Sequence, residues 1–108
     1  MNLIETIAYQ TLQGKIPYQE WLQSLRDSQM KARIRTRVDR LRLGNFGDCK
    51  NVGAGVSELR MHFGPGYRLY FAQDGQTLVV LLCGGDKSTQ NRDIEKALLY
   101  WQDYKRRK

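Results

Sequence analysis

The fold is decided by one stretch of the chain, residues 58–87, with the sequence ELRMHFGPGYRLYFAQDGQTLVVLLCGGDK. Polar and apolar residues alternate over residues 56–63 and again over 67–71, as expected for strands that pack by one face. Gly-Pro-Gly and Asp-Gly turn signals separate these strands from each other and from residues 77–83, which are apolar on both faces. The stretch therefore predicts a meander of strands whose last member is covered on both sides.

The polar face of the first two strands carries side chains suited to RNA chemistry. They are Glu58, Arg60, His62, Arg68 and Tyr70. A strand arginine can bind a phosphate through two parallel hydrogen bonds, and a glutamate or an imidazole can accept a proton beside it. For Arg60 and Arg68 the alternative is a structural ion pair with Glu58. For His62, the single histidine of the chain, the alternative is a structural role.

Lys87 is the remaining candidate in this stretch. It follows the apolar strand and two glycines, and Ser88 or Thr89 can cap a helix that starts there. Because backbone amides at a helix start attract anions, a lysine at this point predicts a phosphate site. The alternative is a plain surface turn. The candidate catalytic residues are therefore Arg68, Lys87, Glu58, His62 and Arg60.

Helical periodicity flanks the predicted strands on both sides. Residues 18–27 and 28–43 each carry an apolar stripe at helical spacing, and a third stripe follows residue 89 and continues to Tyr104. The first ten residues predict a short edge strand. This order indicates one α+β domain, residues 1–108, with two N-terminal helices, a C-terminal helix and a twisted, mostly antiparallel sheet. We expect the helices on one face of the sheet and the polar strand face open to solvent.

The net charge of +7 is concentrated in the second predicted helix. Its cationic residues surround the apolar stripe, opposed only by Asp39. They are Lys31, Arg33, Arg35, Arg37, Arg40 and Arg42. Such a cluster predicts a polyanionic partner, and the alternative is a solvated helix face. We expect these residues, together with Tyr70, to bind RNA or the ribosome.

Several classes of protein are disfavoured by what the sequence lacks. It has no Ser-His-Asp set, and the polar strand face offers only one carboxylate, which is too few for a two-metal nuclease site. We therefore expect neither a metal nor a cofactor. Cys49 and Cys83 predict free thiols in a reducing cytoplasm. No signal peptide and no apolar run of about 20 residues is present, so we expect a cytoplasmic protein without membrane contact.

Four segments and three later residues resemble one known family. They are residues 40–48, 55–60, 64–71 and 82–90, followed by Asp93, Ile94 and Ala97. In these segments the chain resembles the RelE/ParE superfamily of toxins from toxin-antitoxin systems. The resemblance is to its HigB-like branch of phage-derived addiction-module killer proteins, and it covers nearly the whole chain.

This resemblance implies a RelE-like fold and a toxin that cuts messenger RNA on the ribosome. Cleavage in such toxins uses the ribose 2′-hydroxyl as nucleophile and needs no metal. The family's strand arginine matches Arg68, its basic residue after the next strand matches Lys87, and a second arginine matches Arg60 less securely. Ser88 to Asp93 lacks the tyrosine or histidine that some members carry, so the resemblance assigns no general acid.

The resemblance also implies a partner and two alternative functions. The partner is a cognate antitoxin, of the helix-turn-helix HigA-like kind, encoded beside this gene. One alternative is a ParE-like inhibitor of DNA gyrase that cuts no RNA. The other is an attenuated toxin that acts mainly as an antitoxin-binding co-repressor.

Overall fold

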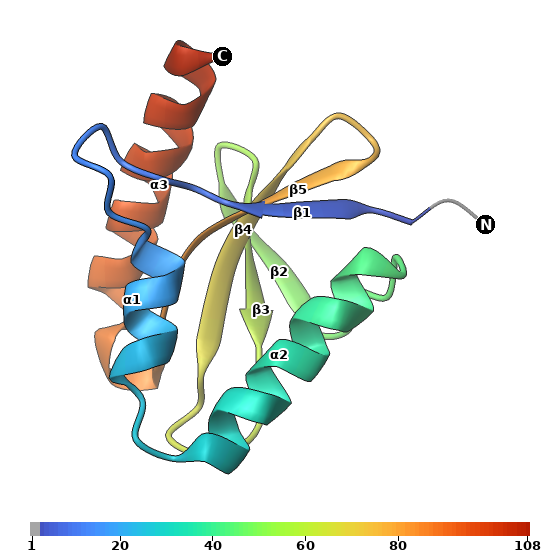
Figure 1. The fold of residues 1–108 in the computed structure, drawn as a ribbon, viewed down its shortest axis with the longest axis vertical. Helices are drawn as coiled ribbons and strands as arrows, with labels where there is room; N and C mark the ends of the chain where they lie inside the picture. The colour runs from blue at the N-terminus through green and yellow to red at the C-terminus, as the bar shows by residue number, and fades with distance from the viewer. Residues whose placement is uncertain (1–2) are drawn as a thin grey trace.

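A computed structural model describes residues 3–108, which form one five-stranded sheet and its flanking helices (Figure 1). The strands are β1 (Glu5–Ala8), β2 (Cys49–Gly53), β3 (Val56–Arg60), β4 (Arg68–Asp74) and β5 (Leu78–Gly85). The helices are α1 (Pro17–Ser24), α2 (Ser28–Arg42) and α3 (Gln90–Arg107), and the short 3₁₀ helix η1 (Lys87–Thr89) leads into α3. The predicted α+β class, with two helices before the meander and one after it, is confirmed.

The sheet has the strand order β1-β5-β4-β3-β2. β1 pairs in parallel with β5, and every other neighbouring pair is antiparallel. The predicted edge strand near the N-terminus is therefore confirmed, as is the predicted burial of β5 on both faces. The register places Arg60 opposite Arg68 and Arg68 opposite Gly85, so two arginines lie side by side at one end of the sheet.

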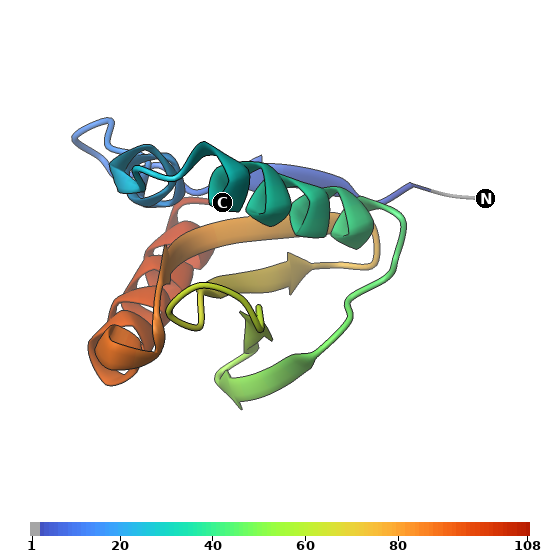
Figure 2. The ribbon, with the colours of Figure 1, turned by 90° about the horizontal axis from the view of Figure 1, so that it is seen from below.

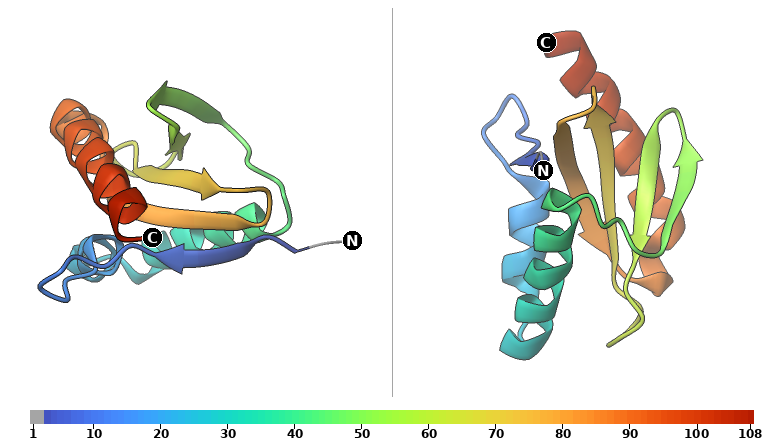
Figure 3. Two further views of the ribbon diagram at one scale, coloured as in Figure 1. Left: turned by 90° about the horizontal axis from the view of Figure 1, so that it is seen from above. Right: turned by 90° about the vertical axis from the view of Figure 1, so that its right-hand side faces the viewer.

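Helices cover both faces of the twisted sheet, which corrects the expectation of one open face (Figures 2 and 3). α1 and α2 pack on the face that includes Leu59, Leu69 and Phe71. α3 packs on the opposite face, where Trp101 belongs to the same buried cluster as Tyr70. The physical reason is that this second face is largely apolar, because Val56, Ala72, Val80 and Leu82 also point into it.

α2 begins at Ser28 because the preceding aspartate caps it. The Asp27 carboxylate accepts hydrogen bonds from the backbone N–H groups of Gln29 and Met30, at 2.9 and 3.3 Å. Leu25 and the capping Asp27 are both extended, so α1 ends at Ser24 and not at Asp27 as the periodicity predicts. α2 then buries Ile34, Val38 and Leu41 and turns its cationic residues outward.

The contact between α1 and β5 leaves no room for a side chain at Gly84. A Cβ there would lie 2.5 Å from Cζ3 of Trp21 and closer still to two other ring carbons. We expect Gly84→Ala to lower the free energy of unfolding by about 1–3 kcal/mol, measured by urea unfolding, because overpacking forces the ring to move. In a Trp21→Ala background the same substitution should cost much less. An equal cost in both backgrounds would contradict this packing.

Candidate functional site

Glu58 stands at the centre of the polar cluster at the end of the sheet. Its side chain is fully buried, and both of its oxygens are occupied. Oε2 accepts hydrogen bonds from the Tyr70 hydroxyl at 2.9 Å and from Nε2 of Gln90, the first residue of α3, at 2.8 Å. Glu58 is therefore a buried anion held between β4 and the start of α3.

The other oxygen of Glu58 faces two arginines. Oε1 lies 3.2 Å from Nε of Arg60 and 3.6 Å from Nη1 of Arg68. The Arg68 side chain is 13% exposed, and its buried Nε has no hydrogen-bond partner among the described residues. One carboxylate thus fixes two guanidinium groups and leaves part of their donor capacity unused. Such a pair can donate hydrogen bonds to the oxygens of a phosphate.

The pKa of Glu58 reflects this surrounding. Burial by itself would raise the pKa, because it disfavours the charged carboxylate. The hydrogen bonds from Gln90, Tyr70 and Arg60 act in the opposite direction, as does the charge of Arg68. Together they hold the pKa of Glu58 below its ordinary value, so the carboxylate stays ionised at neutral pH and keeps both arginines in place.

Glu58 should therefore make the protein sensitive to acid. Because its pKa is lower in the folded chain than in the unfolded one, its contribution to stability is fully present above the ordinary value of 4.5. The contribution is lost as the pH falls through the folded-state pKa. We expect Glu58→Gln to lose less stability than the wild type between about pH 5 and pH 3, measured by urea unfolding. The same loss in both proteins would contradict an ionised, buried Glu58.

Lys87 lies beside the arginine pair but on the surface. It is exposed at the start of η1, directly after β5, where Gly85 is the register partner of Arg68. A Cβ on Gly66 would lie 3.4 Å from Cβ of Lys87, so the loop between β3 and β4 borders the lysine. Arg60, Arg68 and Lys87 are thus brought to the same end of the sheet.

The expectation of free amides at this helix start needs correction. The Asp86 carboxylate accepts hydrogen bonds from both the backbone N–H and the hydroxyl of Ser88, at 2.8 and 2.5 Å. Thr89 in turn donates its hydroxyl to Asp93, which is buried on α3. Because an aspartate of the chain already caps η1, the positive charge available to an anion here comes from Lys87 and not from the Ser88 amide.

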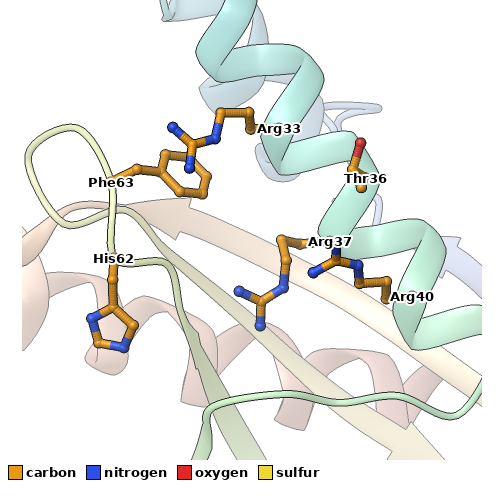
Figure 4. Close-up of a pocket in the computed structure, with 6 residues that line it drawn as sticks. All are labelled: Arg33, Thr36, Arg37, Arg40, His62 and Phe63. Carbon is orange, nitrogen blue, oxygen red and sulfur yellow. The ribbon is translucent and has the colours of Figure 1, made fainter.

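His62 lies apart from the Glu58 cluster, contrary to the strand alternation. β3 ends at Arg60, and the His62 side chain beyond it is 74% exposed. Its Nε2 lies 2.6 Å from Oδ2 of Asp48. This hydrogen bond, ahead of smaller effects of the nearby charges, holds the pKa of Asp48 below its ordinary value. His62 instead lines a hollow with Phe63 and α2 (Figure 4).

Tyr70 is fully buried, so the expectation that it lies on an RNA-facing surface is wrong. Its ring belongs to the core between the sheet and α3, and its hydroxyl donates to Glu58. Burial, with the adjacent Glu58 carboxylate, raises the pKa of Tyr70 and keeps the hydroxyl protonated. In this structure Tyr70 orients Glu58.

The six cationic residues of α2 form no ion pair within residues 3–108. Arg33, Arg37 and Arg40 line the hollow that His62 also borders. Arg35 and Arg42 are exposed elsewhere on the helix, and Lys31 is half-buried. The charge predicted for this helix is therefore available to a partner.

Three residues of the site escaped the sequence analysis. Gln90 reaches Glu58 across 32 positions of the chain, and Asp48 reaches His62 across 14. Asp86 caps η1 from the residue directly before Lys87. No spacing rule links residues so far apart, so only the capping pattern of Asp86 and Thr89 offered a signal.

Cys49 and Cys83 are both free, as predicted. Residues 3–108 contain no group of three or more His, Cys, Asp or Glu side chains placed to hold a metal ion. None of the helices within these residues combines the length and the apolar character that a membrane span requires.

The fold and the comparisons with known proteins both point to proteins related to RelE-like toxins. The mostly antiparallel five-stranded sheet with three helices defines an α+β protein whose architecture is consistent with a RelE-like fold. Residues 20–100 match the family described as "Phage derived protein Gp49-like (DUF891)", and the chain belongs to this family. The family is associated with RelE-like toxins of addiction modules.

One relative extends this match. A protein of Haemophilus influenzae, described as an uncharacterized protein, is 48% identical over 88 residues, which cover 82% of this chain and 89% of the relative. The likeness spans most of both chains. The description names no activity, so the relative assigns no reaction to this chain.

Proposed function

We propose that this protein is the toxin of a toxin-antitoxin module and cuts messenger RNA on the ribosome. The observation that carries the proposal is the arginine pair, Arg60 and Arg68, fixed on the buried Glu58 beside the exposed Lys87. Three cations at one end of a rigid sheet suit the charge that develops on a phosphodiester during cleavage. Membership of a family associated with toxins supports the role of a toxin.

In the proposed reaction the ribose 2′-oxygen attacks the adjacent phosphorus and the bond to the 5′-oxygen breaks. Arg68, assisted by Arg60, stabilises the negative charge on the phosphate oxygens, and Lys87 binds near the leaving oxygen. The 2′-hydroxyl gives up its proton and the leaving 5′-oxygen takes one up from Lys87 or from solvent, so the products are a 2′,3′-cyclic phosphate and a 5′-hydroxyl. The positive charge comes from the protein itself, so we expect this endoribonuclease to need no metal at the site.

The structure changes the part that Glu58 plays in this mechanism. A general base must reach the proton that it removes, whereas Glu58 is fully buried and its oxygens already accept hydrogen bonds. We therefore assign Glu58 to positioning the arginines. Of the two candidate proton acceptors, His62 is the one that RNA can reach from solvent.

We further propose that the exposed cations of α2 bind ribosomal RNA, which is contacted largely through its backbone. Arg35→Glu combined with Arg42→Glu should weaken sedimentation of the protein with ribosomes at moderate salt, because both residues are exposed and neither forms an ion pair with any of residues 3–108. Lys50→Glu with Lys96→Glu, which changes the net charge by the same amount at two exposed positions outside α2, is the matched control. Unchanged sedimentation of the reversed variant would refute the docking role.

Primer extension on messenger RNA after brief induction tests the proposed function in cells. Discrete cuts within translated codons are expected, together with relief of growth arrest when the cognate antitoxin is produced. We propose that this antitoxin is a helix-turn-helix protein encoded by the adjacent reading frame, and that toxin and ribosome meet in the cytoplasm. Intact messages together with induced DNA damage would instead favour inhibition of gyrase.

A further inference from the structure

The face of α2 that points toward the loop after β3 encloses a hollow of about 370 Å³. Its lining residues are Arg33, Thr36, Arg37, Arg40, His62 and Phe63. Figure 4 shows the arginines of α2 on one side of this hollow and His62 and Phe63 on the other. The three arginines share one helix face because they stand four and three positions apart.

One side of the hollow is a planar stack. The guanidinium of Arg33 lies 4.0 Å from the centroid of the Phe63 ring. The Phe63 ring in turn meets the edge of the Tyr67 ring, with centroids 6.0 Å apart, and Tyr67 is buried. The stack is therefore supported from the core. Aromatic rings and guanidinium planes are the surfaces on which unpaired nucleobases stack.

The rest of the hollow supplies positive charge without a paired acid. Arg37 packs directly against the backbone of Gly47, where a Cβ would overlap its Nη2. Neither Arg37 nor Arg40 forms an ion pair within residues 3–108. The carboxylate next to Gly47, that of Asp48, is hydrogen-bonded to His62. Two arginines therefore remain to bind phosphate oxygens.

The hollow also adjoins the proposed cleavage site. His62 on its border and Arg60 of the arginine pair are separated by one residue, so their Cα atoms lie no more than about 7 Å apart. A single strand of RNA that crosses the end of the sheet can contact both. The stacked plane and the adjacent cations match the two parts of a nucleotide, its base and its phosphate.

We propose that this hollow binds one nucleotide of single-stranded RNA next to the phosphate that is cut. Its base stacks on the Arg33–Phe63 pair, and its phosphate binds Arg37 and Arg40. That the bound nucleotide belongs to messenger RNA rests on the proposed function. An acidic protein segment would use the same charges, but it would gain little from a planar stack, and this favours RNA.

Binding of the isolated protein to a short RNA tests the proposal without ribosomes. The probe is fluorescein-labelled 2′-O-methyl hexaadenylate, which lacks the attacking hydroxyl, and its counterpart is an abasic chain of the same length. Fluorescence anisotropy should show at least about fivefold tighter binding of the base-bearing probe, the lower end of the effect of losing one stacked base. Arg33→Lys should reduce this preference and leave binding of the abasic chain unchanged, because lysine keeps the charge and loses the guanidinium plane.

Two further variants complete the test. Arg26→Lys, an exposed position outside the hollow and outside α2, should keep the full preference. Arg37→Ala with Arg40→Ala should reduce the slope of log affinity against log salt by about 1.4, the value for two phosphate contacts to a single strand. Thermal unfolding of each variant confirms that it remains folded.

Either of two results would overturn the proposal. The first is equal binding of the base-bearing and abasic probes by the wild type. The second is that hexaglutamate binds as tightly as the RNA and depends on the Arg33 plane in the same way, which would identify an acidic protein segment as the occupant. Cleavage on programmed ribosomes is scored separately. If only the nucleotide-binding proposal is wrong, the base preference is absent and cleavage at the Arg68 site is still seen. If only the proposed cleavage is wrong, the base preference is still seen and cleavage is absent.

Discussion

Replacing Arg68 by alanine should lower the rate of messenger cleavage by about 10² to 10³-fold while the protein stays folded. Arg68 is paired with Glu58 through Nη1, and the exposed part of its side chain, 13%, can donate to the phosphate that becomes more negative during the reaction. Removing a preorganised donor to such a charge has an effect of this size. The rate is measured under single-turnover conditions on ribosomes programmed with a defined messenger, and growth after induction provides a second readout.

Two further variants separate the chemistry of Arg68 from general loss of charge. Arg68→Lys keeps the charge but not the two parallel donors, so its rate should lie between those of the wild type and the alanine variant. Arg26→Ala removes an exposed arginine between α1 and α2 and should cleave at the wild-type rate. A folded Arg68→Ala protein with wild-type cleavage would show that this arginine does not act on the phosphate.

Replacing Glu58 by alanine should lower the free energy of unfolding by about 3–5 kcal/mol, which is typical when one partner of a buried charged cluster is removed. The substitution leaves Arg68, which is largely buried, without its counter-ion and removes the acceptor of Tyr70 and Gln90. Cleavage should also fail, because neither guanidinium keeps its place. Urea unfolding at neutral pH measures the stability.

Glu95→Ala provides the matched control for this loss. Glu95 is an exposed carboxylate on α3, so its removal should change the free energy of unfolding by no more than about 0.5 kcal/mol. If Glu58→Ala lost as little as the control, Glu58 would not be the anchor that its burial and contacts indicate.

Periodicity was sufficient to predict most of the secondary structure. The apolar stripe of α2 and the doubly apolar β5 each satisfy one simple pattern, and both elements lie where the pattern places them. The alternation in β3 and β4 separates two faces but does not say what covers each. Val56, Ala72 and Tyr70 make the second face apolar enough to hold α3, and this decides that the face is closed.

The candidate site was predictable only where strand pairing brings its members together. Arg60 and Arg68 face each other across β3 and β4, so alternation and a tight turn suffice to place them side by side. The position predicted for His62 was wrong because the strand ends two residues before it. The imidazole is then hydrogen-bonded to Asp48 and not part of the Glu58 cluster. Gln90, at the start of α3, donates a hydrogen bond to Glu58. This contact depends on how the helix packs and not on any local pattern.

The chemistry of the cleaved ends tests the central claim most directly. Programmed ribosomes are treated with the protein, and the new ends of the messenger are identified by their reactivity toward kinase and ligase. Attack by the 2′-hydroxyl at a phosphate held by Arg68 predicts a 2′,3′-cyclic phosphate or 3′-phosphate on the upstream fragment and a 5′-hydroxyl on the downstream one. A 5′-phosphate on the downstream fragment would indicate attack by water and would contradict the mechanism.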